Sequence, residues 1–261
     1  MVTVVIPTFN RAALLPRAVD SVLAQTYQAF ELIVVDDHSG DETPEALAQW
    51  QGDGRVSVIR HAENRGVSAA RNTGLAAGRG ELAAFLDSDD EWLPSKLEAQ
   101  AEYFAAHPEA MLVQTQERWM RKGRRVNPGQ KHLKKAGDIF IDSVSLCLIS
   151  PSAVMLRRRL LDEVGNFDET LRAAEDYDLW LRVLARYPAG LIDRELVIRH
   201  GGRDDQLSAQ PGLDKYRVMA LEKILREPLT PARRQAAEAE LQRRRGIYEA
   251  GRLKRAGVVT E

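Results

Sequence analysis

The sequence has little of what marks secreted or membrane-spanning proteins. Its 261 residues include one cysteine, Cys147, which excludes an intrachain disulfide and a cysteine-based metal site. No segment approaches the ~18 consecutive apolar residues that a membrane-spanning helix needs. The first residues, Met1 to Pro7, lack the basic segment of a signal peptide. We therefore expect a protein of the reducing cytoplasm, without a leader or a transmembrane anchor.

An excess of charge of one sign is also missing. The chain has 37 Lys and Arg against 38 Asp and Glu, for a net charge of −1. This balance gives no overall electrostatic footprint for DNA or RNA, so we expect no nucleic-acid partner. The 44% hydrophobic content is ordinary for a soluble globular protein and is enough to build a sizeable core.

Short apolar runs alternate with amphipathic segments through the first 110 residues. We expect strands at 2–6, 30–35, 56–60 and 82–86, the first ending at Pro7, and helices at 12–25, from Thr43, at 67–77 and at 94–106. Thr43 is predicted to cap its helix, with Pro44 in the first turn. Strands and helices that alternate at this spacing predict an α/β fold with a parallel sheet.

The second half of the chain is less regular. Strands are predicted at 111–119, 149–156 and 191–199, and an amphipathic helix follows Glu175. Residues 121–135 are rich in Lys and Arg, and we interpret them as a basic loop. Two readings stay open: a solvated surface excursion, or a lid or contact for an anionic acceptor. Residues 200–208 form a polar loop, and a helical tail begins near Leu213.

Acidic side chains follow two of the predicted strands directly. Asp36 and Asp37 end the second strand, and Asp87-Ser88-Asp89-Asp90 ends the strand that begins at Leu82. The carboxyl ends of parallel strands meet at one edge of a sheet, so Asp37 and Asp89 are expected to share a site. Two carboxylates spaced Asp-x-Asp suit a hard divalent cation whose other ligands are water and phosphate. Asp90 is expected to cap the following helix instead.

Six segments, in order, resemble the family 2 glycosyltransferases, which are inverting enzymes of the GT-A fold. The resemblance spans roughly residues 2 to 208 and lies in the segments 4–11 (VVIPTFNR), 31–39 (ELIVVDDHS), 64–72 (NRGVSAARN), 85–90 (FLDSDD), 165–169 (GNFDE) and 175–180 (EDYDLW). It implies a GT-A, Rossmann-like sheet, mixed but mostly parallel and flanked by helices, with a helical C-terminal tail. The glycosyltransferase domain is placed at 1–210, with a nucleotide-sugar half at 1–110, an acceptor half at 111–210 and an extension at 211–261.

The resemblance also implies roles for individual residues. It implies that a nucleotide-diphosphate sugar, foremost a UDP-sugar, donates its sugar to a hydroxyl of a saccharide or lipid-linked acceptor, with Mg²⁺ or Mn²⁺ assisting. The implied donor-binding residues are Pro7, Thr8, Arg11, Asp37, Arg71, Asp87 and Ser88. The implied metal ligands are Asp89, Asp87 and His200, and the implied general base is Asp176.

The chemistry of inverting transfer accounts for two of these roles. The acceptor hydroxyl loses a proton as it attacks, which one nearby carboxylate can accept, and the leaving diphosphate gains charge that a cation stabilises. Two other classes remain open: a non-catalytic nucleotide- or sugar-binding module, and another metal-dependent nucleotide enzyme such as a nucleotidyltransferase. The segment Pro7 to Asn10 has no glycine, which disfavours the phosphate loop of a nucleotidyltransferase.

The tail carries many arginines and supports three hypotheses. Its helices can pair with a second subunit to form a homodimer, or its arginines can touch an anionic membrane as a peripheral contact at the inner face. In the third interpretation the helices cover the domain and the arginines stay in water. The resemblance as a whole indicates a role in synthesis of cell-surface polysaccharide or glycoconjugate.

Overall fold

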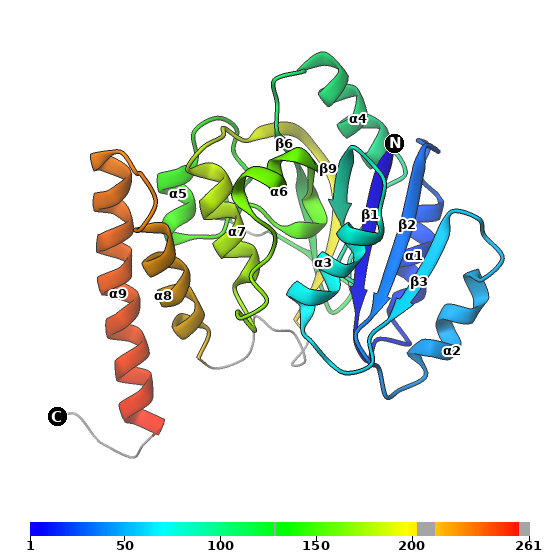
Figure 1. Ribbon diagram of the computed structural model, residues 1–261, viewed down its shortest axis with the longest axis horizontal. Coiled ribbons are helices and arrows are strands. Elements are labelled where there is room, and N and C mark those ends of the chain that lie inside the picture. The colour runs from blue at the N-terminus through cyan, green and yellow to red at the C-terminus, as the bar shows by residue number, and fades with distance from the viewer. Residues whose placement is uncertain (128, 203–211, 256–261) are drawn as a thin grey trace.

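One mixed sheet runs through the centre of the molecule. The computed structural model describes residues 1–127, 129–202 and 212–255 (Figure 1). Its strands are β1 (Val2–Thr8), β2 (Phe30–Asp36), β3 (Val56–Arg60), β4 (Leu82–Phe85), β5 (Glu91–Trp92), β6 (Leu112–Arg121), β7 (Arg124–Val126), β8 (Val154–Arg157) and β9 (Gly190–Gly201). Within the described residues their order is β3-β2-β1-β4-β8-β6-β9-β5, and β7 extends β6 as a hairpin.

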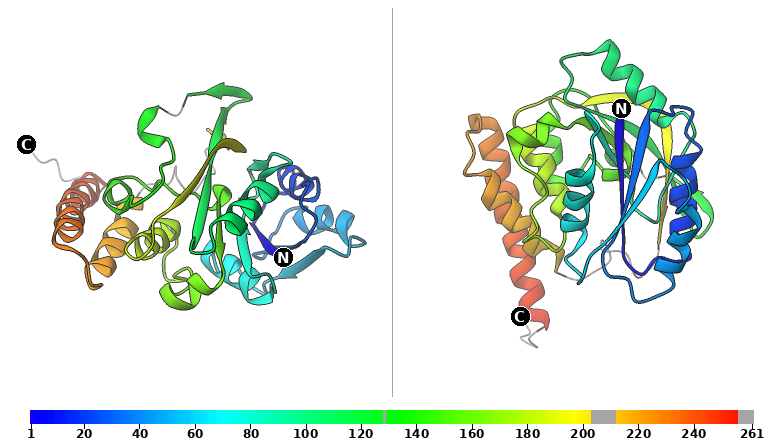
Figure 2. Two further views of the ribbon diagram at one scale, coloured as in Figure 1. Left: turned by 90° about the horizontal axis from the view of Figure 1, so that it is seen from above. Right: turned by 45° about the vertical axis from the view of Figure 1, so that its right-hand side comes forward.

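Helices cover both faces of the sheet (Figures 1 and 2). They are α1 (Leu15–Leu23), α2 (Thr43–Leu47), α3 (Val67–Ala77), α4 (Lys96–Ala106), α5 (Phe140–Ser145), α6 (Arg159–Val164), α7 (Glu175–Leu184), α8 (Leu213–Ile224) and α9 (Pro231–Arg255). Side chains alternate between faces along a strand. Val4 and Ile6 of β1 therefore join a core with α1, α2 and α4, whereas Val5 joins the core of α3 and α5 to α9.

The first four strands form the parallel half that the sequence predicts. β1 pairs in parallel with β2 and β4, and β2 pairs in parallel with β3. β1 continues through Pro7 and Thr8, so the prediction that Pro7 ends it was wrong. Pro7 lies past Val5, the last residue that pairs with β4, so its missing amide removes no bond from that ladder. The acidic ends of β2 and β4 consequently lie at one edge of the sheet.

Beyond β4 the sheet changes direction. β8 pairs antiparallel with β4 and β6, while β9 runs parallel to β6 and antiparallel to β5. The β6–β9 register shifts on either side of Gln116, a bulge of the kind that re-aims side chains near functional sites. Both predicted halves contribute strands to this sheet. The predicted division at residue 210 lies outside the described residues, as does most of the polar loop expected at 200–208.

The basic stretch 121–135 is more ordered than a loop. β6 and β7 form a hairpin whose two connecting residues, Lys122 and Gly123, have φ values of 48° and 73°. Positive φ at both positions is the geometry of the tight turn that joins twisted antiparallel strands. A 3₁₀ turn (Gln130–His132) follows. The prediction of an irregular loop at 121–135 was therefore wrong for Arg124 to Val126.

The C-terminal helices pack against the body of the protein, as Figure 1 shows at the end opposite β3. Ala237 and Leu241 of α9 are buried in the same core as α5, α7 and α8. Arginines of α9 bond to acceptors of this chain: Arg233 to Asp138, Arg234 to the Leu225 carbonyl, Arg243 to Glu240, Arg244 to Glu240 and Asp214, Arg245 to Glu222, and Arg252 to Glu249. Among the described residues, no helix is both long enough and apolar enough to cross a membrane.

Candidate active site

The segments that follow β1 and β2 are bonded to each other. The Asn10 amide donates to the Ser39 hydroxyl at 2.9 Å, and the Gly40 amide donates to Asn10 Oδ1 at 2.8 Å. The Arg11 amide donates to Thr43 Oγ1 at 2.9 Å. Thr43 accepts this bond and donates to Asp41. It is the first residue of α2, whose N-cap position is Glu42, so the predicted capping role of Thr43 was wrong. These bonds fix the backbone around the predicted donor residues.

Among those residues, Thr8 has a buried hydroxyl group that is available to a ligand. Its side chain is 2% exposed, and its hydroxyl has no hydrogen-bond partner within the described part of the chain. A buried hydroxyl without a partner is destabilising, which favours a ligand that completes the bond. Pro7 is buried in β1 beside it, and the Arg11 side chain lies partly exposed at the start of the α1 segment.

Asp37 is a buried anchor for the loop that precedes α3. Its carboxylate accepts bonds from the His61 ring at 2.7 Å, the Arg65 amide at 2.9 Å and the Gly66 amide at 2.7 Å. The Asp37 amide donates to the Thr8 carbonyl at 2.9 Å. The structure thus places Asp37 beside Thr8, and it shows a supporting role that the sequence did not reveal.

Arg71 joins two carboxylates from distant parts of the chain. Its guanidinium donates to Asp87 Oδ1 at 2.8 Å and to Glu175 Oε1 at 2.6 Å. The side chain is 3% exposed and lies over the Phe167 ring, 5.1 Å from its centroid. Burial lowers the pKa of Arg71, but the charges of Asp87 and Glu175 raise it more, so the group stays cationic. Arg71 therefore links the end of β4 to the start of α7.

The acidic end of β4 folds into a turn held from three sides. Ser152 donates to Asp90 Oδ2 at 2.7 Å and accepts the Asp87 amide at 3.2 Å, and the His200 amide donates to Asp90 Oδ1 at 3.1 Å. Arg17 of α1 donates to the Asp89 carbonyl at 2.6 Å. Ser88 is buried, whereas the Asp87 and Asp89 side chains are partly exposed.

Asp90 was predicted to cap the next helix, and this is wrong. α4 begins at Lys96 and its N-cap is Ser95. Burial, together with the charges of Asp89 and Asp87, raises the pKa of Asp90 well above its ordinary value. Asp90 instead ties the turn to Ser152 and to the end of β9, a contact that joins residues 110 positions apart and has no local signature.

Asp176 lies in the first turn of α7 beside Glu175. α7 begins after Ala174, which has a φ of 56°, a left-handed conformation that costs a non-glycine residue about 1 kcal/mol. Asp176 Oδ1 accepts the Tyr177 amide at 2.7 Å, and the Cys147 Sγ lies 3.8 Å from Oδ2. The carboxylate is partly exposed, so it can meet a ligand, and the bond from Arg71 to Glu175 fixes the turn that carries it.

Arg199 is a cation of this region that the sequence did not single out. Its guanidinium lies 5.3 Å from the Trp119 ring centroid and 3.8 Å from Glu117 Oε2. Burial opposes its charge, but Glu117, Asp90, Asp87 and Asp176 together raise the pKa of Arg199. Its charge is thus felt by both the β4 turn and Asp176. The only sequence signal is its place beside His200 at the end of a predicted strand.

His200 lies near the end of β9, where it pairs with Met120 of β6. Its Nε2 is 3.5 Å from Glu91 Oε2. Burial and the charge of Arg17 lower the pKa of His200, and Glu91 opposes that shift. The backbone of His200 contacts Asp90, so the predicted metal ligand is at the acidic turn.

The donor set fits a hard cation that brings other ligands with it. Within the described residues, no group of three or more His, Cys, Asp and Glu side chains is arranged to hold a metal by itself. Asp87 and Asp89 are partly exposed at one turn, and Asp90 is buried beside them; burial first, and then the charges of Asp89 and Asp87, raise the pKa of Asp90. Carboxylates of this kind suit Mg²⁺ or Mn²⁺ when a diphosphate and water complete the shell.

Comparisons with known proteins identify the family of the chain. The model of the family described as Glycosyl transferase family 2 matches residues 3–165. An uncharacterized glycosyltransferase of Rickettsia conorii is 32% identical over 195 residues, which cover 75% of this chain and 32% of that protein. The chain therefore spans about a third of the length of that relative. TuaG of Bacillus subtilis, provisionally named as a teichuronic acid biosynthesis glycosyltransferase, is 30% identical over 71% of this chain and 73% of its own.

Solved structures share the fold. S. aureus TarS 1–349 in complex with UDP-GlcNAc has a TM-score of 0.76 at 22% identity, covering 93% of this chain and 72% of that one. Mannosyltransferase PcManGT from Pyrobaculum calidifontis, in complex with GDP-Man and Mn²⁺, has a TM-score of 0.72 at 20% identity, covering 100% and 76%. The expected GT-A architecture, a mixed sheet flanked by helices with a helical C-terminal end, is thereby confirmed.

Proposed function

Because the chain belongs to glycosyl transferase family 2, we propose that it moves a sugar from a nucleotide-diphosphate sugar to an acceptor hydroxyl with inversion at the anomeric carbon. The observation that carries the proposal is the bridge made by Arg71. One buried guanidinium bonds both Asp87, at the acidic turn, and Glu175, next to Asp176. An inverting transferase needs a charge-stabilising group and a base in fixed relation to each other.

The nucleotide lies at the ends of β1 and β2 in this proposal. The buried Thr8 hydroxyl is available to a ligand, and Pro7, Arg11 and Asp37 surround it on segments fixed by backbone bonds. UDP-GlcNAc and GDP-Man occur in the two structural neighbours, which supports a nucleotide sugar and leaves the base open. We propose a UDP-sugar as the donor.

Asp87 and Asp89 would hold Mg²⁺ or Mn²⁺ at the diphosphate, with Ser88 in the same turn and His200 beside it. A bound divalent cation supplies positive charge that stabilises the leaving nucleotide diphosphate. Arg199 adds a protein cation near the same place, because its charge already interacts with Asp87 and Asp90. The bond from Arg71 holds the Asp87 carboxylate in position.

Asp176 would act as the general base. It accepts the proton of the acceptor hydroxyl as that oxygen attacks the anomeric carbon and the bond to the diphosphate breaks. The Tyr177 amide holds one carboxylate oxygen, which leaves the other to meet the acceptor near Cys147. The likeness to TuaG supports a saccharide or lipid-linked acceptor and a role in cell-surface polysaccharide synthesis.

A thermal-shift experiment tests the donor and metal sites together. We expect UDP to raise the melting temperature in the presence of Mn²⁺ and not in excess chelator, because a ligand of the folded state stabilises by about 2.7 kcal/mol at a hundred times its Kd. Asp89→Asn should lose the metal-dependent shift. Asp162→Asn, an exposed carboxylate of α6, is the matched control and should keep it.

A screen of nucleotide sugars then tests transfer. Slow, Mn²⁺-dependent hydrolysis of one donor identifies the sugar and separates a transferase from a non-catalytic binding module. If UDP still raises the melting temperature in excess chelator, the assignment of Asp87 and Asp89 as metal ligands is wrong. Release of pyrophosphate from a nucleoside triphosphate and a sugar phosphate would instead favour a nucleotidyltransferase.

A further inference from the structure

The β6–β7 hairpin and the segment after it form a surface of unusual charge. Residues 118–137 contain no Asp or Glu. The left view of Figure 2 shows the hairpin and the following turn projecting from the body of the protein. We call the exposed side chains of this part the hairpin surface: Arg121, Lys122, Arg124, Arg125, Lys131, Leu133 and Lys135.

Several cations of the hairpin surface lack a partner carboxylate. Arg125 pairs with Glu195 and Lys135 pairs with Asp142, at 2.6 and 2.8 Å. Among the residues that the structure describes, the others form no ion pair with a carboxylate: Arg121, Lys122, Arg124 and Lys131. The arginines of α9 are the opposite case, because intrachain carboxylates and carbonyls already engage them. Among the residues described, four cations without an ion pair are therefore gathered on the hairpin surface, whereas six arginines of α9 are engaged by acceptors of this chain.

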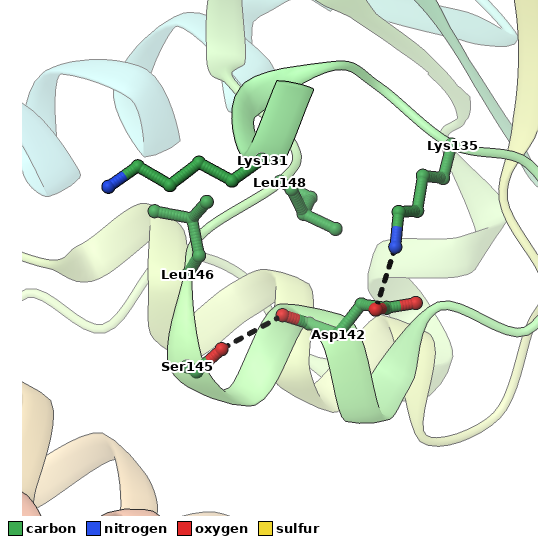
Figure 3. A pocket seen from close by; sticks show the side chains of 6 residues that line it. All are labelled: Lys131, Lys135, Asp142, Ser145, Leu146 and Leu148. Atoms are coloured by element: carbon green, nitrogen blue, oxygen red, sulfur yellow. Dashed lines mark hydrogen bonds and ion pairs between the residues drawn. The ribbon is translucent and has the colours of Figure 1, made fainter. Parts of the chain in front are cut away.

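Exposed aliphatic side chains accompany these cations. Leu133 is 48% exposed, and Ile141 of the adjacent α5 is 52% exposed. A pocket of about 330 Å³ lies in the same part of the chain, lined by Lys131, Lys135, Asp142, Ser145, Leu146 and Leu148. Figure 3 shows Lys131 and Lys135 on either side of Leu148. This pocket thus offers an apolar floor with ammonium groups at its rim.

A second pocket continues the surface toward the hairpin. It measures about 580 Å³, and its lining combines Trp119, Val126 and Leu133 with Arg125 and the carboxylates of Glu117, Asp193 and Glu195. Glu117 is paired with Lys134 and Glu195 with Arg125, so two of the three carboxylates are neutralised within the chain. Leu133 lines this second pocket, and the His132 ring lies 5.1 Å from that of Trp119, which packs the turn that carries Leu133 against β6. The short segment from Lys131 to Leu133 thus contributes a cation to the first pocket and an aliphatic side chain to the second.

We propose that the hairpin surface binds an anionic membrane surface. Its free cations would contact lipid phosphates, and Leu133 and Ile141 would enter the boundary of the acyl chains. Cations attract anionic headgroups, and exposed aliphatic groups gain from leaving water. A soluble polyanion would be attracted by the charges but would leave both aliphatic groups in water. Nucleic acid stacks its bases on aromatic rings, and here Trp119 is already engaged by Arg199 and His132.

The surface adjoins the candidate active site. Trp119 and Glu117 of β6 contact Arg199, whose charge interacts with Asp87 and Asp176. Docking through the hairpin would bring this edge of the sheet close to the lipid. Membrane binding itself does not depend on the proposed transfer, so each can fail without the other.

Vesicle sedimentation of the full chain tests the proposal. We expect binding to phosphatidylcholine vesicles that contain ~30% phosphatidylglycerol, no binding to phosphatidylcholine alone, and a fall in binding as salt rises. Lys122→Glu with Arg124→Glu should weaken binding at least ~10-fold, and Leu133→Ser by ~3-fold. The matched control is Arg159→Glu with Arg226→Glu, an equal change of charge at exposed residues of another surface, which should bind as the unchanged protein does.

Two results would overturn the proposal: the unchanged protein fails to sediment with the anionic vesicles, or the hairpin and control variants lose binding equally. In the first case, binding to soluble polygalacturonate that requires Lys122 and Arg124 would assign the surface to a soluble polyanion. If a variant unfolds, the salt dependence of vesicle binding by the unchanged protein still tests the proposal. Circular dichroism of each variant identifies that case.

Discussion

Arg71 and Glu175, 104 positions apart, are joined by a 2.6 Å hydrogen bond in the protein interior. The same guanidinium bonds Asp87, so the acidic turn and the first turn of α7 share one buried cation. Neither carboxylate can move without disturbing the other. This bridge sets the relation between the two chemical roles of the proposed site.

Arg71→Lys should be strongly destabilising. A lysine ammonium can bond one of the two carboxylates but lacks the planar fork that reaches both. Breaking a buried ion pair costs about 3 kcal/mol or more, and transfer should fall at least ~100-fold because Asp176 loses its fixed position. Urea unfolding and donor turnover measure the two effects.

Arg65→Lys is the control for that variant, since Arg65 pairs with Glu169 at 3.1 Å on the surface. Its free energy of unfolding should change by less than about 0.5 kcal/mol. If the two variants behave alike, the bridge has no special role. In a double-mutant cycle, Arg71→Met and Glu175→Gln together should cost less than the sum of the single changes.

Asp176→Asn should separate binding from chemistry. The amide cannot accept the acceptor proton, so kcat should fall ~10²- to 10⁴-fold, while the Kd for the nucleotide stays within about twofold. Isothermal calorimetry and a transfer assay with the donor found by screening give the two values. Loss of nucleotide binding in this variant would show that Asp176 belongs to the donor site instead.

The site could be foreseen from the sequence only in part. Asp87 and Asp89 follow a recognisable local pattern, because the end of a strand is encoded by neighbouring residues, whereas Asp176 was implied by the family resemblance alone. Arg71 was predicted to lie near the nucleotide base or phosphate, and the structure shows it bonded to protein carboxylates. Contacts between segments so far apart depend on how helices pack on the sheet, which periodicity does not determine.

The fold, too, could be predicted from the sequence only in part. Strands of the parallel half were predicted within two residues because their apolar runs are continuous. β5 was missed because its two residues, Glu91 and Trp92, pair only with β9 from the far end of the chain. The hairpin was missed although Lys122-Gly123 is a two-residue turn, because its strands are basic rather than apolar. A search for alternating apolar and polar residues therefore does not detect these strands.

Glu117 should make stability depend on acid pH. Burial raises its pKa, but Lys134, Arg199 and the bond from Ser150 outweigh burial and hold the pKa of Glu117 at about 2, against an ordinary value of 4.5. The folded state thus binds this proton less readily than the unfolded chain. Its stabilisation is complete above about pH 5 and is lost as the pH falls toward 2, by on the order of 3 kcal/mol.

Glu117→Gln should flatten this dependence. The variant should be less stable than the unchanged protein at pH 7, and the difference should shrink between pH 5 and 2.5. Urea midpoints at a series of pH values measure it, with Glu45→Gln, on α2, as a control. Parallel curves for Glu117→Gln and the unchanged protein would contradict the assignment.

Cys147 should report on the charge of Asp176. Burial, and then the nearby Asp176 charge, raise the pKa of the Cys147 thiol well above its ordinary value, so little reactive thiolate is present at neutral pH. As the only cysteine, it gives a single alkylation site. Iodoacetamide should label it far more slowly than a free thiol, and Asp176→Asn should speed labelling severalfold at pH 8. An unchanged rate in that variant would show that burial alone protects the thiol.

The left-handed conformation of Ala174 has a consequence for the history of the sequence. A glycine there would relieve the backbone and, taken alone, would stabilise the fold. It would also loosen the turn from which Asp176 projects. At this position, higher thermal stability and a fixed orientation of the Asp176 carboxylate are therefore opposed. Selection for catalysis would keep alanine, although its backbone is strained there.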